Sequence, residues 1–130
     1  MPTPNDLFLD TGKSLTTAAL LAGNTVKYVA WGTGNGASST STLTALVTAA
    51  APTTVTAVTG TASQVTTTVT SDTYQVAGTV TAGGTLAITE VIVLNQATIS
   101  GATAYQYGYF STMNVASGDT ITFTMKVKYA

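Results

Sequence analysis

Apolar and polar residues alternate along most of the second half of the chain. The clearest segment is 120–129, where odd positions carry Ile, Phe, Met, Val and Tyr and even positions carry Thr or Lys. Because successive side chains of a strand point to opposite faces, this period of two predicts a β-strand with one buried face. Segments 64–70 and 74–80 alternate similarly, and Ser71-Asp72 between them predicts a tight turn.

Three other segments depart from simple alternation. Thr85–Leu94 is apolar on both faces, which predicts a central strand that is covered from each side. Thr25–Trp31 is rich in β-branched and aromatic residues and predicts the first strand. Lys13–Ala22 is rich in Ala and Leu and is followed by Gly23-Asn24, which predicts a short helix that ends there.

These segments predict a mainly β fold. The short intervals between strands leave no room for crossover helices, so we expect an antiparallel β-sandwich or a small β-barrel of about 6–7 strands. Residues 1–24 would form an N-terminal arm and short helix, and residues 25–130 a single antiparallel β domain. A chain of 130 residues is long enough for one hydrophobic core.

The composition removes most kinds of catalytic chemistry. The sequence has no histidine and no cysteine, and its charged residues are four lysines and five acids. Acid–base catalysis near neutral pH, thiol nucleophiles and metal sites with nitrogen or sulfur ligands need the missing residue types. We therefore expect a protein that is not an enzyme, with no catalytic residues, no cofactor and no metal.

The charge also bears on partners. A net charge of −1 gives no attraction to nucleic acid or anionic lipid. The sequence contains no run of about 18 apolar residues, so we expect no membrane span. A monomer with so few charges is a poor colloid, so we expect other subunits to cover much of the surface. The alternative is a small secreted domain that its hydroxyl groups keep soluble.

The carboxylates fall into two groups. Asp72 and Asp119 lie in turn contexts, where we expect them to bond to nearby backbone. Glu90 stands alone in an apolar strand, where we expect it to pair with Lys27 or with a backbone donor. The alternative is the acid of a glycan-active enzyme, which requires a second carboxylate facing it.

Two groups of residues are candidates for contact with a partner. Leu7-Phe8-Leu9 lies in the N-terminal arm, and its apolar side chains need a surface on which to dock. Tyr105, Tyr107 and Tyr109 alternate along one predicted strand and would share a face. With Trp31, the tyrosines would form a sugar-stacking platform or a subunit contact. Alternatively, they fill the edge of the sandwich.

Three stretches resemble small virion structural proteins of tailed bacteriophages. In that family a strand ending in a Trp-Gly-Thr-Gly-like turn precedes a hairpin-rich β domain. The stretches are KYVAWGTG (27–34), GTASQVTTTVTSDTYQVAGTVTA (60–82) with LAITEV (86–91), and NVASGDTITFTMKVKYA (114–130). The family pattern has "ITE", a small residue and a Gly, from which Val91-Ile92-Val93 departs.

The resemblance implies a β-structural role in a virus particle. Capsid decoration (cement) proteins are the best match in size; they bind the outside of the shell, often as trimers, and stabilise contacts between major capsid protein subunits. We therefore expect a homotrimer on the capsid exterior, assembled in the host cytoplasm. The alternative is a tail-fibre, baseplate or adhesin-like module that recognises a host surface glycan.

Overall fold

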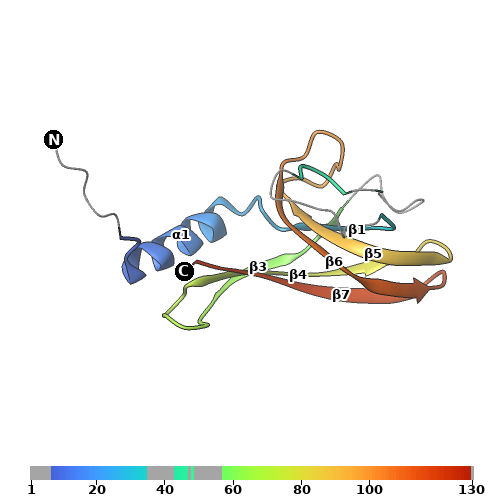
Figure 1. Cartoon of the computed structure of the whole chain (residues 1–130). Helices are drawn as coiled ribbons and strands as arrows, with labels where there is room; N and C mark the ends of the chain where they lie inside the picture. Colours follow the sequence, from blue (N-terminus) through green and yellow to red (C-terminus); the bar gives the residue numbers. More distant parts are fainter. Residues whose placement is uncertain (1–6, 35–42, 47, 49–56, 130) are drawn as a thin grey trace.

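The computed structural model describes residues 7–34, 43–46, 48 and 57–129. These residues form two antiparallel sheets that pack face to face as a sandwich, with one short N-terminal helix (Figure 1). The elements are α1 (Asp10–Gly23), β1 (Tyr28–Gly32), β2 (Val58–Thr59), β3 (Thr61–Val65), β4 (Thr73–Thr81), β5 (Leu86–Leu94), β6 (Ala104–Val115) and β7 (Thr120–Lys128). The predicted fold class is confirmed, and of its two alternatives the sandwich is the one adopted.

The strand order explains why one strand is apolar on both faces. The four-stranded sheet has the order β2-β1-β5-β6 and the other sheet the order β3-β4-β7, so β5 is an inner strand. Val91 and Val93 of β5 lie in the core between the sheets. Ile92 and Leu94 lie in a smaller second cluster, against which Leu46 packs. The central position predicted for 85–94 is confirmed.

Strand β7 shows the alternation that its sequence predicts. Phe123 is buried in the core between the sheets, and Ile121, Met125 and Tyr129 pack against that core. The threonines and lysines between them are exposed. Because β7 pairs with β4 along its whole length, from Thr120 to Lys128, one apolar face is enough to attach it to the fold.

The strand predicted over 64–70 is partly wrong. Strand β3 ends at Val65, and the chain then turns before β4 begins. The Asp72 carboxylate accepts hydrogen bonds from the backbone N–H groups of Thr67 at 2.9 Å and Val69 at 2.9 Å. These N–H groups are used within the turn and are not available to a neighbouring strand, so the ladder stops before them.

Helix α1 lies at one end of the sandwich, beside the turn between β3 and β4 (Figure 1). It begins at Asp10, earlier than the predicted start at Lys13, and ends at Gly23 as predicted. Asn24 has a φ of 53° and caps the helix, donating its backbone N–H to the Leu20 carbonyl. Asn tolerates this left-handed conformation better than most residues do, which explains why the helix stops there.

Hydrogen bonds attach the helix to the β3–β4 turn. The buried Thr17 hydroxyl donates to the Ser71 carbonyl at 2.6 Å. The side-chain amide of Gln64 donates to the Thr17 hydroxyl at 2.8 Å and to the Ser14 carbonyl at 3.2 Å. Leu20 adds an apolar contact with the core. Directional bonds of this kind fix how the helix is rotated, and therefore which of its residues face outward.

Candidate functional site

The N-terminal end of the molecule exposes large apolar side chains. Leu7 is 81% exposed, Leu15 is 71% exposed, and Leu9 is exposed as well. Phe8 is 49% exposed. We call these four residues the N-terminal patch. They lie just before α1 and on its first two turns. This end of the helix points away from the two sheets (Figure 1).

The patch is anchored to the sandwich through one aromatic ring. The Phe8 ring meets the Tyr129 ring edge-to-face, with centroids 6.4 Å apart and an interplanar angle of 89°. A Cβ atom added at Gly12 would lie 3.0 Å from the Phe8 ring, so the glycine lets the ring lie close against the helix. The patch is therefore held in place against the β domain.

Beneath Phe8 lies a cluster of three tyrosines. The rings of Tyr74 and Tyr105 meet edge-to-face at 5.7 Å, and the hydroxyls of Tyr105 and Tyr129 share a hydrogen bond of 2.7 Å. Tyr74 donates its hydroxyl to the Val26 carbonyl at 2.6 Å. Burial raises the pKa of Tyr105, and its hydrogen bond to Tyr129 raises it further. The cluster is a neutral support for the N-terminal end.

The predicted tyrosine row does not share one face, so that interpretation is wrong. Tyr105 packs against the core between the sheets, whereas Tyr107 packs in the second cluster on the outer face of its sheet. Tyr109 is 58% exposed. The pairing of β5 with β6 shifts register between Val93 and Leu94, opposite this part of β6. Such an irregularity interrupts the simple alternation of side chains, which the sequence alone does not reveal.

Trp31 is also not a surface platform. Its side chain is 1% exposed and meets the Phe123 ring edge-to-face, with centroids 6.4 Å apart. It lies in the core because β1 is an inner strand of its sheet, between β2 and β5. The expectation that Trp31 contacts a partner is therefore corrected. Among the predicted contact residues, Leu7, Leu9 and Tyr109 are the most exposed.

Glu90 is a fully buried carboxylate of β5 that binds the backbone of Gly34 and Thr48. Its Oε1 atom accepts the backbone N–H of Gly34 at 3.1 Å and that of Thr48 at 2.8 Å. Its Oε2 atom accepts the Tyr107 hydroxyl at 2.6 Å. The expected backbone donor is confirmed. Burial, together with the hydrogen bond to Glu90, raises the pKa of Tyr107 well above its usual value, so the phenol stays a donor.

The surroundings of Glu90 are shaped to admit its carboxylate. A Cβ atom at Gly32 would collide with the Glu90 carboxylate and with the Thr48 carbonyl, so only glycine permits this close approach. Lys27, the other partner considered from the sequence, donates its ammonium group to the Asn24 side chain at 3.0 Å. The Glu90 carboxylate therefore serves as an acceptor for backbone N–H groups from two distant segments.

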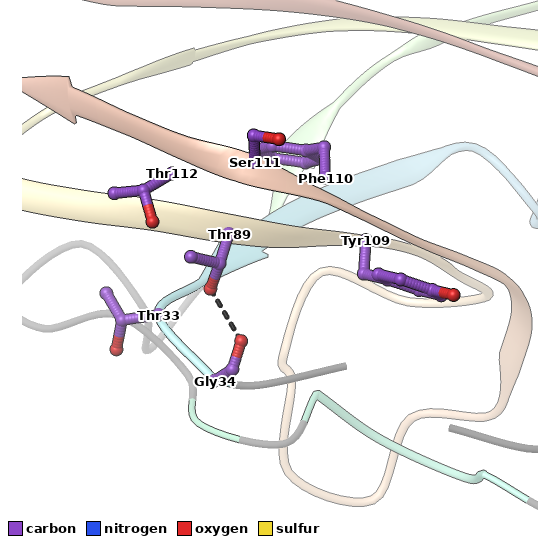
Figure 2. A pocket seen from close by; sticks show the side chains of 7 residues that line it. All are labelled: Thr33, Gly34, Thr89, Tyr109, Phe110, Ser111 and Thr112. Carbon is purple, nitrogen blue, oxygen red and sulfur yellow. Dashed lines mark hydrogen bonds between the residues drawn. The ribbon is translucent and has the colours of Figure 1, made fainter. Parts of the chain in front are cut away.

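A pocket of about 320 Å³ opens beside Thr33 and Gly34, and Figure 2 shows its lining residues. The lining consists mainly of hydroxyl-bearing and aromatic side chains: Thr33, Gly34, Thr89, Tyr109, Phe110, Ser111 and Thr112. The Thr89 hydroxyl donates to the Gly34 carbonyl at 2.6 Å, the bond drawn in Figure 2. Sequence reasoning found Tyr109 but missed the threonines, because they come from three separate segments.

A larger hollow of about 740 Å³ lies between β6 and β7. It is more apolar, with Phe110, Met113, Phe123 and Met125 among its lining residues. It lies at the edge of the sandwich formed by β6 and β7, the last strands of the two sheets.

Some kinds of site have no counterpart in the described part of the chain. Residues 7–34, 43–46, 48 and 57–129 hold no group of three or more metal-ligating side chains of the His, Cys, Asp and Glu types. Nor does the helix within those residues have the length and apolar character needed to cross a membrane.

Comparisons with known proteins add no assignment. No protein-family model matches the chain, and neither a curated protein nor a solved structure matches it.

Proposed function

We propose that this chain is a non-enzymatic bacteriophage virion structural protein, and that it is a capsid decoration (cement) protein. In this role it binds the outer capsid surface and stabilises contacts between major capsid protein subunits. The observation that carries the proposal is the N-terminal patch, an exposed apolar surface that contacts the β domain through the Phe8 and Tyr129 rings. The resemblance of 27–34, of 60–82 with 86–91, and of 114–130 to phage virion proteins supports the same role.

The energetics of the patch suit attachment to a large partner. Fully burying one leucine side chain contributes about 1.5–3 kcal/mol, so a few leucines make a modest contact. On a repeating shell, copies joined to one another add their contacts together. The low charge of the chain helps as well, because little charge has to be desolvated when its surface is covered.

We place the protein on the capsid exterior as a homotrimer, with the major capsid protein as its partner and assembly in the host cytoplasm. Three joined copies would present three patches to the shell. Each would then bind with a higher effective concentration than a free monomer has. This arrangement requires neither nucleic acid nor a membrane as a partner.

The decisive measurement is the location and copy number of the protein in native particles, by electron microscopy and quantitative mass spectrometry. Hundreds of copies on the shell would support a decoration protein. A few copies at the tail would refute it and favour the tail-fibre or adhesin-like alternative.

The role of the patch is tested with purified protein added to particles from which it has been stripped. A Leu9→Ser/Leu15→Ser double variant should bind at least about tenfold more weakly, since it loses two leucine side chains that binding would bury. Met113→Ser, which changes an exposed apolar residue of β6 outside the patch, is the matched control and should bind normally. Equal binding by the double variant and the wild type would exclude the patch as the contact surface.

A further inference from the structure

The sandwich is closed along one side and open along the other. On the closed side, β2 and β3 are separated only by Gly60, where the chain passes from one sheet to the other. The Gly60 N–H donates to the Lys27 carbonyl at 2.8 Å, which fixes this crossing. On the open side, β6 and β7 are the last strands of their sheets, and the hollow of about 740 Å³ lies between them (Figure 1). The open side is therefore where a further strand can be added.

Strand β7 directs backbone groups to this open side. Its register with β4 is unbroken. Tyr129, just after β7, donates its N–H to the Asp72 carbonyl at 2.9 Å, on the β4 side, whereas the Lys126 carbonyl accepts the side-chain amide of Gln106 from β6 at 2.9 Å. Because successive residues of a strand direct their backbone groups to alternate edges, Thr124 directs its N–H and C=O to the open side, as Lys126 does. Such an edge is a template for an extended segment of another chain.

The side chains along this edge indicate what the segment must carry. Phe110, Phe123 and Met125 line the hollow, and none of the described residues that line it is charged. An added strand would direct every second side chain into the hollow and the others to the outer face of the sheet. On that outer face Lys126 and Lys128 are exposed, and neither forms an ion pair with another described residue. The fitting segment is therefore apolar at alternate positions and acidic at a position between them.

The chain itself contains a segment of this kind, Asp6-Leu7-Phe8-Leu9. Leu9 has an extended backbone, with φ −69° and ψ 152°. Phe8 packs against Tyr129 of its own copy, whereas Leu7 is 81% exposed and Leu9 is 62% exposed. Because the two leucines are exposed, they do not fill the hollow of their own copy. They are available to the hollow of a second copy.

We propose that residues 6–9 of one copy add as an antiparallel strand to β7 of a neighbouring copy. In the register that sets Asp6 opposite Lys126, opposite charges meet on the outer face, and Leu7 lies opposite Met125 at the hollow. The contact joins two different surfaces, so it repeats head to tail, and three copies close it into a ring. This inference rests on the homotrimer of the proposed function and names the contact that forms it.

The N-terminal patch then has two uses. Leu7 and Leu9 join the copies, while Leu15, on the helix, stays exposed to the shell. Loss of Leu9 weakens attachment by separating the copies, since each copy then binds the shell alone. Leu15 and Met113 lie outside the pairs that this register forms, so changes at either should leave the trimer intact.

The proposal is tested by sedimentation equilibrium of the full-length protein. The wild type should form trimers. Leu7→Ser should raise the dissociation constant at least about tenfold, because the contact loses a leucine that it buries. Leu7 is 81% exposed in the single copy, so its fold should not change. Leu15→Ser, the same substitution at another exposed leucine of the patch, is the matched control and should form trimers normally.

A second pair of variants tests the edge of β7. Thr124→Pro removes the N–H directed to the open side, so it should prevent addition of the strand while pairing with β4 remains. Thr124→Val keeps that N–H and should form trimers normally. Lys126→Glu is a further edge variant that leaves the backbone unchanged. It should weaken association severalfold, and Asp6→Lys in the same chain should restore it.

Mixing the variants shows whether the segment and the edge meet. Leu7→Ser keeps the β7 edge and Thr124→Pro keeps the N-terminal segment, so together they should form dimers that neither forms alone. A mixture that contains no dimers would overturn the proposal, as would a monomeric wild type or trimers retained by both Leu7→Ser and Lys126→Glu. The location and copy number on native particles test the decoration role separately. A trimer of this kind found at the tail would refute that role and leave the contact between copies standing.

Discussion

Two regions of this molecule are organised around a buried carboxylate, and they use it over very different distances. In the β3–β4 turn, the fully buried Asp72 accepts the N–H of Thr67, five positions away. In strand β5, the equally buried Glu90 accepts the N–H groups of Gly34 and Thr48, which are 56 and 42 positions away. One acid closes a local turn, whereas the other joins distant segments.

The difference matters because each acid supports a different candidate surface. The turn closed by Asp72 presents the carbonyl of Ser71, at a φ of 56°, to the Thr17 hydroxyl of the helix. It thereby helps to orient the N-terminal patch. Glu90 orders Gly34 and so builds a wall of the pocket. Two of the few charged residues in this protein therefore orient parts of its surface: Asp72 the N-terminal patch, and Glu90 the pocket wall at Gly34.

We expect the largest loss of stability when Glu90, the acid that joins distant segments, is removed. Glu90→Ala leaves the N–H groups of Gly34 and Thr48 and the Tyr107 hydroxyl without their acceptor. Since each buried unsatisfied donor costs about 1–3 kcal/mol, we expect the free energy of unfolding to fall by roughly 3–5 kcal/mol. Urea unfolding followed by tryptophan fluorescence measures this, because Trp31 lies in the core.

Glu90→Gln is the matched control for that prediction. It keeps the shape and one acceptor oxygen, so it should lose less stability than Glu90→Ala. If both variants unfold at the wild-type urea concentration, the bonds of Glu90 to Gly34 and Thr48 do not stabilise the fold, and the contrast between the two acids fails.

A smaller loss is expected at the local acid. Asp72→Asn removes an acceptor from the turn, but Thr67 and Thr68 are exposed, so water can solvate their N–H groups after the change. The midpoint of thermal unfolding should fall, by less than for Glu90→Ala. A loss equal to or greater than that of Glu90→Ala would show that local and long-range carboxylates contribute alike.

The same acid makes stability depend on pH. Burial by itself would raise the pKa of Asp72, but the hydrogen bonds from Val69, Thr67, Thr68 and Thr73 outweigh burial, and the pKa lies well below its ordinary value. A group with a lowered folded-state pKa stabilises the protein above its unfolded pKa of about 3.9 and loses that contribution as the pH falls further. The stability difference between wild type and Asp72→Asn should therefore shrink below about pH 4. A difference that stays constant from pH 6 to pH 2 would contradict this account.

The same contrast explains what could be predicted from the sequence. Local features were predictable: the alternation of β7, the end of α1, and the bonding of Asp72 to nearby backbone all depend on adjacent residues. Burial of Trp31 and separation of Tyr105 from Tyr107 depend on strand order and on register shifts, which are set by partners far along the chain. The pocket was hidden for the same reason, because Thr33, Thr89 and Thr112 meet only after the sheet has formed.

A still smaller effect is expected where the turn meets the helix. Thr17→Val keeps the shape of the side chain but leaves the Ser71 carbonyl without its donor and removes an acceptor from Gln64. We expect a loss of about 1–2 kcal/mol, together with faster amide hydrogen exchange in α1 but not in β5. Thr16→Val is the control, because the Thr16 hydroxyl bonds only within the helix, to the Gly12 carbonyl, among the contacts described. If both variants show the same hydrogen exchange in α1, the bond from Thr17 to the Ser71 carbonyl does not hold the helix in place.

The smallest effect on stability is expected on the N-terminal patch itself. Leu15 is 71% exposed, so Leu15→Gln removes little buried area and should change the free energy of unfolding by no more than about 0.5 kcal/mol. Leu20→Gln, one and a half turns further along on the face packed against the core, should destabilise the protein clearly. Urea unfolding compares the two variants, and binding to particles stripped of the protein reports whether Leu15→Gln weakens attachment. A residue whose loss weakens attachment to particles without weakening the fold is an interface residue; a large loss of stability from Leu15→Gln would instead make it part of the core.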